Sequence, residues 1–214
     1  MILLQSSKKR TMKRKLLNSI MILTVILSAE TRKVQEDESE YWMEYWAQAR
    51  GLEVALVKAI SWKESKIGVH KERIEPHLKT AKWYLRLLDP KEKAEPYSFF
   101  SMGDMQILYG IAKSLGYTGE PHGLLHPKEN YQWGTLYLKT LCISEKNIDR
   151  AVSAYNQGKV VGKGGKIFKS KYIDENNNGI KDRFEKWKNQ YYVNTVLNRY
   201  KRYGGKIDIR KEIK

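Results

Sequence analysis

Apolar residues in this chain recur mainly at steps of three and four, the spacing that places side chains on one face of an α-helix. One such row reads Val57, Ile60, Glu64 and Ile67. Its single acid is either a solvated side chain beside Lys63 and Lys66 or a carboxylic acid held in an apolar wall. In the second case, burial would disfavour the ionised form of Glu64 and raise its pKa toward that of a general acid.

Start and stop signals divide the chain into a series of helices. Prolines and an asparagine stand where helices are expected to begin, and glycines stand where they are expected to end. The predicted helices cover residues 41–50, 52–66, 77–88, 103–115, 128–143, 148–157 and 184–203. Strand-like alternation is absent over any useful length, so the fold class is predicted to be mainly α, with a minor hairpin near residues 159–169.

The N-terminal residues 1–29 have the layout of a secretory signal peptide. Six Lys and Arg residues come first without an acid, and a 14-residue apolar run follows, shorter than the about 20 residues of a membrane span. We expect export to the periplasm or cell envelope. Two alternatives stay open: an uncleaved N-terminal anchor that holds the chain at a membrane, and a start at Met12. Residues 30–40 are charged and aperiodic, which predicts a linker before the domain formed by residues 41–214.

The length and composition allow one sizeable hydrophobic core. With 214 residues and 41% hydrophobic content, a single domain after the leader is the expected organisation. The six Trp, fourteen Tyr and four Phe suit either a dense core or a groove that stacks on sugar rings. The one cysteine, Cys142, lies in an apolar stretch, which excludes an internal disulfide and predicts a buried, unreactive thiol.

The chain is basic even without its leader. The leader contains six of the 40 Lys and Arg residues, which leaves 34 against 24 acidic residues and a net charge of +10. This charge favours an anionic partner, such as the phosphate-bearing polymers of a cell wall. The basic residues are spread along the chain, and neither an RNA-binding signature nor a zinc-finger spacing occurs. Nucleic acid is therefore not an expected partner.

Several motifs follow one another in a fixed order. They are the helix "ALVKAISWKES" that ends in Glu64 and Ser65, then "RIEPHL", "SMGDMQI", "AVSAYNQG" and "YYVNTVLNRY". This succession resembles the lytic transglycosylases, lysozyme-like enzymes that cleave peptidoglycan and are related to goose-type lysozyme. "RIEPHL" is similar to an R-Y-E-P stretch of a phage and prophage-like branch. The resemblance implies a lysozyme-like catalytic domain over residues 41–214 that acts on glycan strands, as a monomer and without a cofactor for its chemistry.

The resemblance also implies a role for each matching position. Glu64 would be the single catalytic residue: it protonates the oxygen between MurNAc and GlcNAc and then helps the MurNAc 6-hydroxyl close a 1,6-anhydro ring. The substrate-binding residues that it implies are Ser65, Met105, Gln106, Tyr155, Asn156 and Tyr192. Read from the residues alone, Gln106 could equally be a solvated helix residue, Tyr155 a core aromatic and Asn156 a polar group at a helix end.

The chain departs from the family pattern at several places, among them the 42 steps from Glu64 to Gln106, which exceed the common family spacing. Asp104 stands where the family has Leu, and no acid precedes Tyr192 in "NQYY". A goose-lysozyme-type hydrolase, with Asp104 or another acid holding a water, is therefore an alternative function. A non-catalytic protein that binds the cell wall is another. Arg73 and Glu75 of "RIEPHL" are expected either to form a salt bridge with each other or to position substrate.

A second candidate site lies in "DENNNGIKDRFE". Its oxygen-bearing positions have the spacing of an EF-hand-like calcium loop, with Gly179 at the sharp turn. The predicted ligands are Asp174, Asn176, Asn178, the carbonyl of Ile180, Asp182 and Glu185. The sequence therefore predicts a structural calcium ion of modest affinity, and the alternative is a polar surface turn.

Overall fold

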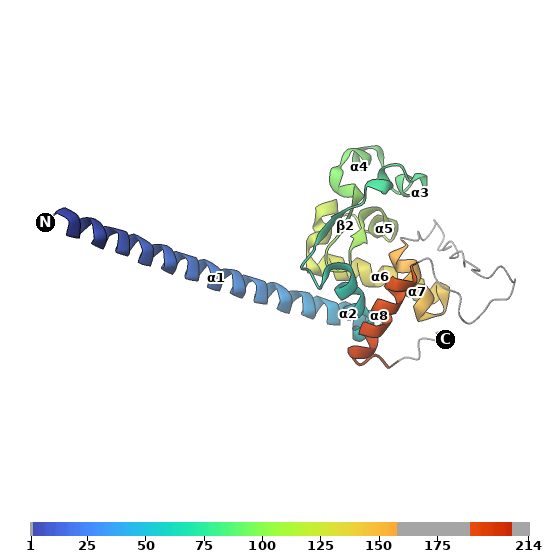
Figure 1. The fold of residues 1–214 in the computed structure, drawn as a ribbon. Coiled ribbons are helices and arrows are strands. Elements are labelled where there is room, and N and C mark those ends of the chain that lie inside the picture. The colour runs from blue at the N-terminus through green and yellow to red at the C-terminus, as the bar shows by residue number, and fades with distance from the viewer. Residues whose placement is uncertain (1, 158–188, 207–214) are drawn as a thin grey trace. The chain divides into compact units, whose positions relative to one another are not determined.

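The computed structural model describes residues 2–157 and 189–206, and it divides into two compact units, Met1–Glu38 and Ser39–Lys214. Helix α1 (Ile2–Ala49) provides the described residues of the first unit and the first residues of the second (Figure 1). Residues 30–40, predicted to be an aperiodic linker, are helical within α1. Within the part of the chain that the structure describes, none of the helices has the length and apolar character needed to cross a membrane.

The second unit is built mainly from helices, which confirms the mainly α fold class. After α1 come α2 (Val54–Ser65), α3 (Lys82–Leu85), α4 (Pro90–Ala94), α5 (Tyr109–Ser114), α6 (Pro127–Glu145), α7 (Ile148–Asn156) and α8 (Gln190–Arg202). The 3₁₀ helices are η1 (Pro76–Lys79), η2 (Pro96–Phe99) and η3 (Pro121–Leu125). All five prolines of the chain begin a helix, where the missing N–H costs nothing.

The longer helices begin and end close to their predicted positions. Helix α6 begins at Pro127, and the side chain of Asn147 caps α7 by accepting a hydrogen bond from Asp149 N at 3.1 Å. Gly51 follows the end of α1 in a left-handed conformation, as a helix stop requires. The described part of the last predicted helix is α8, whereas residues 184–188 and the predicted hairpin at 159–169 lie outside the described residues.

Two predicted helices are wrong in part. Residues 103–115 are helical only in α5, because Gly103 and Gln106 adopt left-handed backbone angles that turn the chain instead of continuing a helix. Residues 77–88 form η1 and α3 rather than one helix, since the extended backbone of Ala81 separates them.

In place of a helix, residues 103–108 form a turn and the last strand of a small antiparallel sheet. This sheet consists of β1 (Glu72–Ile74), β2 (Phe100–Met102) and β3 (Ile107–Leu108), in the order β1-β2-β3. Across it, Arg73 is paired with Ser101, and Ser101 with Leu108. The register therefore brings the "RIEPHL" and "SMGDMQI" motifs side by side.

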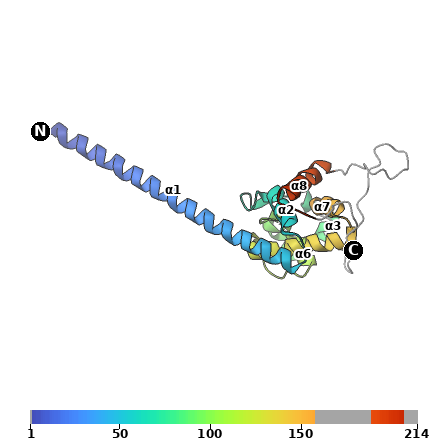
Figure 2. The ribbon, with the colours of Figure 1, turned by 90° about the horizontal axis from the view of Figure 1, so that it is seen from below.

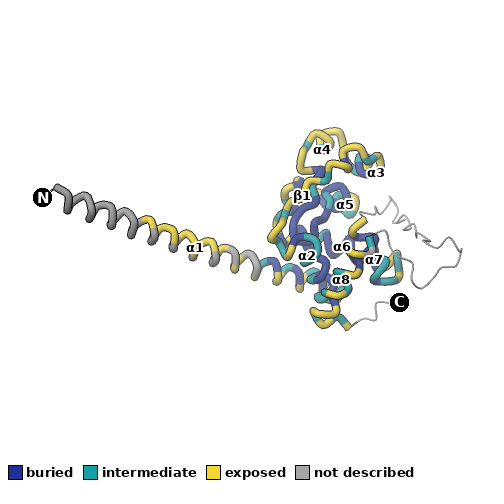
Figure 3. The backbone as a smooth tube through the Cα atoms, in the orientation of Figure 1, coloured by how far each residue is buried: buried dark blue, intermediate teal, exposed yellow. Residues whose placement is uncertain are grey.

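The core of the second unit lies between α2, α6, α7 and α8. Helix α2 packs beside α8, and α7 contacts both α6 and α8 (Figure 2). Buried positions follow these inner elements, while α3 and α4 are largely exposed (Figure 3). Cys142 on α6 is buried, as predicted, and burial raises the pKa of its thiol to about 11. This packing fixes the ends of α2, α7 and α8, where the candidate residues stand.

Candidate active site

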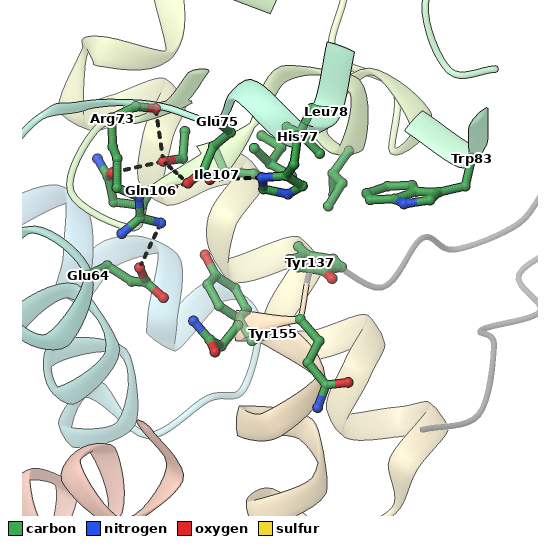
Figure 4. Close-up of a pocket in the computed structure, with 15 residues that line it drawn as sticks. Glu64, Arg73, Glu75, His77, Leu78, Trp83, Gln106, Ile107, Tyr137 and Tyr155 are labelled. Atoms are coloured by element: carbon green, nitrogen blue, oxygen red, sulfur yellow. Dashed lines mark hydrogen bonds and ion pairs between the residues drawn. The ribbon is translucent and has the colours of Figure 1, made fainter. Parts of the chain in front are cut away.

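A pocket opens between the sheet, η1 and the end of α7, and it collects most of the predicted site residues. Glu64, Gln106, Tyr155 and Asn156 all line it. In Figure 4, Glu64 and Trp83 lie on opposite sides of the pocket. The pocket therefore has the predicted catalytic acid on one side and an aromatic side chain on the other.

Glu64 lies in an apolar wall, as the second interpretation of its helical row requires. Val57 and Ile60 are fully buried on the same face of α2, and the Glu64 side chain is only 5% exposed. The fourth member of the row, Ile67, lies beyond the end of α2, in a left-handed conformation. The solvated-acid interpretation is therefore wrong for this side chain.

The Glu64 carboxyl has a separate neighbour at each oxygen. Tyr192 donates a hydrogen bond to Oε1 at 2.6 Å, and Arg73 Nη2 lies 3.8 Å from Oε2. Burial raises the pKa of Glu64 above 4.5, against the opposing effects of the Tyr192 hydrogen bond and the charges of Arg73 and Lys63. The charge of Glu75 adds to the increase. The net effect favours a protonated carboxyl at higher pH than an ordinary glutamate.

Ser65 joins the end of α2 to the turn between β2 and β3. Its hydroxyl lies 2.7 Å from the carbonyl oxygen of Asp104 and accepts a hydrogen bond from Gly68 N at 2.8 Å. Ser65 itself is fully buried and does not line the pocket. Its contacts hold the backbone beside Glu64 in place, so Ser65 supports the site rather than lining the pocket as the predicted substrate-binding residue would.

Gln106 is buried on a left-handed turn, so the interpretation as a solvated helix residue is wrong. Its amide nitrogen lies 2.9–3.1 Å from the carbonyl oxygens of Gly103, His70 and Lys71. Its amide oxygen accepts a hydrogen bond from Ser101 at 2.9 Å. These contacts lock the side chain at the pocket wall and brace the sheet beside it.

Met105 lies behind the pocket rather than in it. It is fully buried, and it packs so closely on α6 that a Cβ added at Gly134 would lie 2.6 Å from its sulfur. Its backbone carbonyl accepts a hydrogen bond from the Tyr155 hydroxyl at 2.9 Å. Met105 therefore supports the wall instead of contacting substrate.

The two predicted residues at the end of α7 form the wall facing Glu64. Tyr155 is buried, and its ring lies 5.1 Å from that of Tyr137, which also lines the pocket. Burial raises the pKa of Tyr155, and the charge of Glu64 raises it further. Asn156 is exposed, and its side-chain oxygen accepts a hydrogen bond from Asn189 at 3.0 Å.

Asp104 does not line the pocket. Its side chain is fully buried. The Asp104 side chain fits beside Gly68 because glycine has no Cβ. A Cβ added at Gly68 would lie 2.8 Å from Asp104 Oδ1. A water that attacks a sugar in the pocket is therefore out of reach of this carboxyl, which removes the support for Asp104 in the hydrolase alternative.

The salt bridge predicted between Arg73 and Glu75 is present and borders the pocket. Arg73 Nε lies 2.7 Å from Glu75 Oε1, and both residues line the pocket together with Glu64. His77 Nδ1 lies 3.6 Å from Glu75 Oε2. The predicted ion pair is therefore confirmed, whereas a role of the pair in positioning substrate stays a prediction.

Asn130 is a site-supporting residue that sequence reasoning missed. It is fully buried on α6, where its amide nitrogen donates to the carbonyls of Met102 and Leu124, and its oxygen accepts from Met105 N at 2.7 Å. A Cβ added at Gly103 would lie 2.1 Å from the same amide. The sequence did contain a signal for this role: Asn130 is a polar residue at a core-facing position of the helix that became α6, four residues before Gly134.

The predicted calcium ligands at 174–185 lie outside the described residues. Within residues 2–157 and 189–206, no group of three or more His, Cys, Asp or Glu side chains could hold a metal ion.

Comparison with protein families agrees with this geometry. Residues 41–180, more than half of the chain, match the family described as Transglycosylase SLT domain. Neither the curated proteins nor the solved structures gave a match to this chain. The matched region contains Glu64 and the pocket residues of the sheet and α7, whereas Tyr192 lies beyond it. The chain belongs to the SLT-domain family and is a peptidoglycan lytic transglycosylase, a lyase that cleaves glycan strands.

Proposed function

We propose that this enzyme cleaves the β-1,4 bond between MurNAc and GlcNAc and releases 1,6-anhydroMurNAc ends, with Glu64 as its only catalytic residue. The observation that carries the proposal is the Glu64 carboxyl, which lines the pocket and whose pKa is raised by its burial. Glycosidases that consume water generally use two carboxyl groups. The other carboxyl among the described residues of the pocket belongs to Glu75, which is paired with Arg73.

In the first step, protonated Glu64 donates its proton to the glycosidic oxygen as the bond to C1 of MurNAc breaks. The 2-acetamido group of the same sugar stabilises the positive charge that develops at C1. Glu64 is then a carboxylate, for which the Tyr192 hydroxyl at 2.6 Å and the Arg73 guanidinium at 3.8 Å provide a hydrogen bond and an opposite charge.

In the second step, the Glu64 carboxylate removes the proton of the MurNAc 6-hydroxyl, whose oxygen bonds to C1. The carboxyl is thereby restored to its protonated form, and no water is consumed. One residue therefore serves first as acid and then as base. This cycle requires a carboxyl that is protonated at rest, which burial favours.

We propose that Trp83 binds a sugar distant from the cleaved bond. Trp83 is 38% exposed, lines the pocket, and is braced edge-on by the Tyr84 ring at 5.4 Å. Exposed aromatic rings offer a flat apolar surface on which the C–H face of a sugar packs. A pocket lined by such a ring and by the candidate acid suits a sugar polymer as substrate.

Mass spectrometry of the products released from purified sacculi tests this function. Transglycosylation leaves anhydro ends, which are lighter by one water than the reducing ends left by hydrolysis. Anhydro products support the proposal. Reducing ends would establish the goose-lysozyme-type alternative, and the absence of any release would establish a non-catalytic wall-binding protein.

We propose that residues 1–29 direct export of the enzyme, with an uncleaved membrane anchor as the alternative. Peptidoglycan lies outside the cytoplasmic membrane, so this family acts there. The basic n-region and the short apolar run support the proposal. Comparing the N-terminus of the mature protein with position 30 tests it, because an intact leader would contradict cleavage.

We further propose that residues 174–185 bind a structural calcium ion, on the strength of their ligand spacing. Calcium should then raise the melting temperature of the enzyme, and Asp174→Ala should abolish that increase. An unchanged melting temperature of the unmutated protein in calcium would contradict the site.

A further inference from the structure

Arg73 lies between two carboxyl groups at unequal distances. Its Nε is 2.7 Å from Glu75 Oε1, a hydrogen-bonded ion pair, whereas its Nη2 is 3.8 Å from Glu64 Oε2 (Figure 4). The Arg73 side chain is 52% exposed, and the Glu64 side chain is 5% exposed. The closer partner of Arg73 is therefore Glu75, although the candidate catalytic acid is within reach of its charge.

Glu75 is itself fixed from several directions. Its backbone N–H donates to the carbonyl of Phe99 at 2.9 Å, which extends the pairing of β1 with β2 by one residue. The Ser101 hydroxyl lies 3.2 Å from its Oε1, and His77 Nδ1 lies 3.6 Å from its Oε2. The Glu75 carboxyl therefore defines where the guanidinium of Arg73 can sit.

The chemistry proposed for Glu64 sets two opposing requirements. Before reaction the carboxyl must be protonated, but an unopposed guanidinium at this distance would favour the carboxylate. After the first proton transfer the carboxylate must persist long enough to remove the second proton, and the same guanidinium then stabilises it. A cation whose charge is partly offset by a nearby anion satisfies both requirements.

We propose that Glu75 is a positioning residue that acts through Arg73: it holds the guanidinium short of a direct hydrogen bond to Glu64 and offsets its charge. Glu64 can then begin the reaction as an acid and pass through the carboxylate state. This inference rests on the proposed role of Glu64.

The charges around Glu64 agree in sign with this arrangement. Arg73 lowers the pKa of Glu64, and Glu75 raises it. The other groups that face Glu64 are Lys63 on its own helix, Tyr155 on α7 and Tyr192 on α8. Variants of Arg73 and Glu75 leave these three groups unchanged. Such variants therefore isolate the contribution of the Arg73–Glu75 ion pair to the pKa of Glu64.

Three variants test the inference: Glu75→Gln, Arg73→Gln and the double variant. The measurement is the rate of anhydro product release from sacculi between pH 4 and pH 9. In Glu75→Gln the uncompensated Arg73 favours ionised Glu64, so the ratio of the rate at pH 5 to the rate at pH 7 should rise about tenfold. In Arg73→Gln that ratio should fall. The double variant should return close to the unmutated profile.

Glu72→Gln is the matched control. Glu72 lies on the same strand, is exposed and does not line the pocket, so this variant removes the same charge without disturbing the ion pair. Its pH profile should match that of the unmutated enzyme. Melting temperatures of all variants verify that each is folded at the assay temperature.

The outcomes separate this inference from the function on which it depends. Absence of anhydro products from the unmutated enzyme would overturn both. Normal products together with unmoved pH profiles in both single variants would overturn the inference alone. Loss of activity at every pH in folded Glu75→Gln would also overturn it, because it would mean that Glu75 takes part in the chemistry directly.

Discussion

The hydroxyl of Tyr192 lies 2.6 Å from Oε1 of Glu64, although 128 positions separate the two residues. The contact follows from the packing of α8 beside α2. It brings a hydrogen-bond donor to an otherwise buried carboxyl, and it adds to the site a residue beyond the matched family region.

Removal of this donor should change both the rate and its pH dependence. The Tyr192 hydrogen bond lowers the pKa of Glu64, so in Tyr192→Phe the pKa of that carboxyl should rise. The decline of activity at high pH should then move to higher pH. The maximum rate should fall about tenfold, because the carboxylate formed during the reaction loses a charge-assisted hydrogen bond. A pH–rate profile on sacculi measures both effects, and an unchanged profile would contradict the role of Tyr192.

The raised pKa of Glu64 also predicts how stability varies with pH. The folded chain retains this proton at pH values where the unfolded chain, with a carboxyl pKa near 4.5, has released it. Glu64 therefore lowers stability progressively as the pH rises above about 4.5. Glu64→Gln should melt at a higher temperature than the unmutated enzyme at pH 8, and the difference should shrink toward zero at pH 3.5.

Calorimetry at pH 8 and pH 3.5 tests the direction of this stability difference. The control is Glu72→Gln, because Glu72 is exposed. A Glu64→Gln variant that is no more stable than the unmutated enzyme at pH 8 would indicate that burial imposes no cost on the ionised carboxyl.

Asn130 should be the main support of the turn that contains Gln106. Asn130→Ala leaves two buried carbonyls and one buried N–H without their partner, so we expect a loss of about 3 kcal/mol in the free energy of unfolding. Activity should fall even where the variant remains folded. Denaturant unfolding measures the loss, and half-buried Gln132→Ala on the same helix is the comparison. Equal stability of the two variants would contradict the bracing role.

Trp83 should affect substrate binding more than the chemical step. Trp83→Ala removes the aromatic surface, so KM for soluble glycan chains should rise about tenfold while kcat stays within about twofold. Trp83→Phe should retain part of the binding because it retains a flat ring. A loss confined to kcat would mean that no sugar binds on this ring.

The sequence predicts some parts of this site well because the signals are local. The apolar row around Glu64 depends only on helical spacing, and the start of α7 depends on the side chain of Asn147 bonding two residues ahead. These features do not require knowledge of distant segments.

Other parts depend on contacts that no local pattern encodes. The strands have two or three residues, too few for an alternating pattern to be recognised. Gln106 lies on a left-handed turn inside a segment with helical spacing, because its amide bonds to the carbonyls of His70 and Lys71, about 35 positions earlier. Arg73 likewise reaches Glu64 only through the pairing of β1 with β2.

The most direct test of the account is product release by Glu64→Gln. The variant retains the size of the side chain and an oxygen that can accept the Tyr192 hydrogen bond, but it has no acidic proton to transfer. The folded variant should release no anhydro-MurNAc fragments from sacculi under conditions in which the unmutated enzyme solubilises them. Release of those fragments by Glu64→Gln at a rate near that of the unmutated enzyme would contradict the assignment of Glu64 as the catalytic acid.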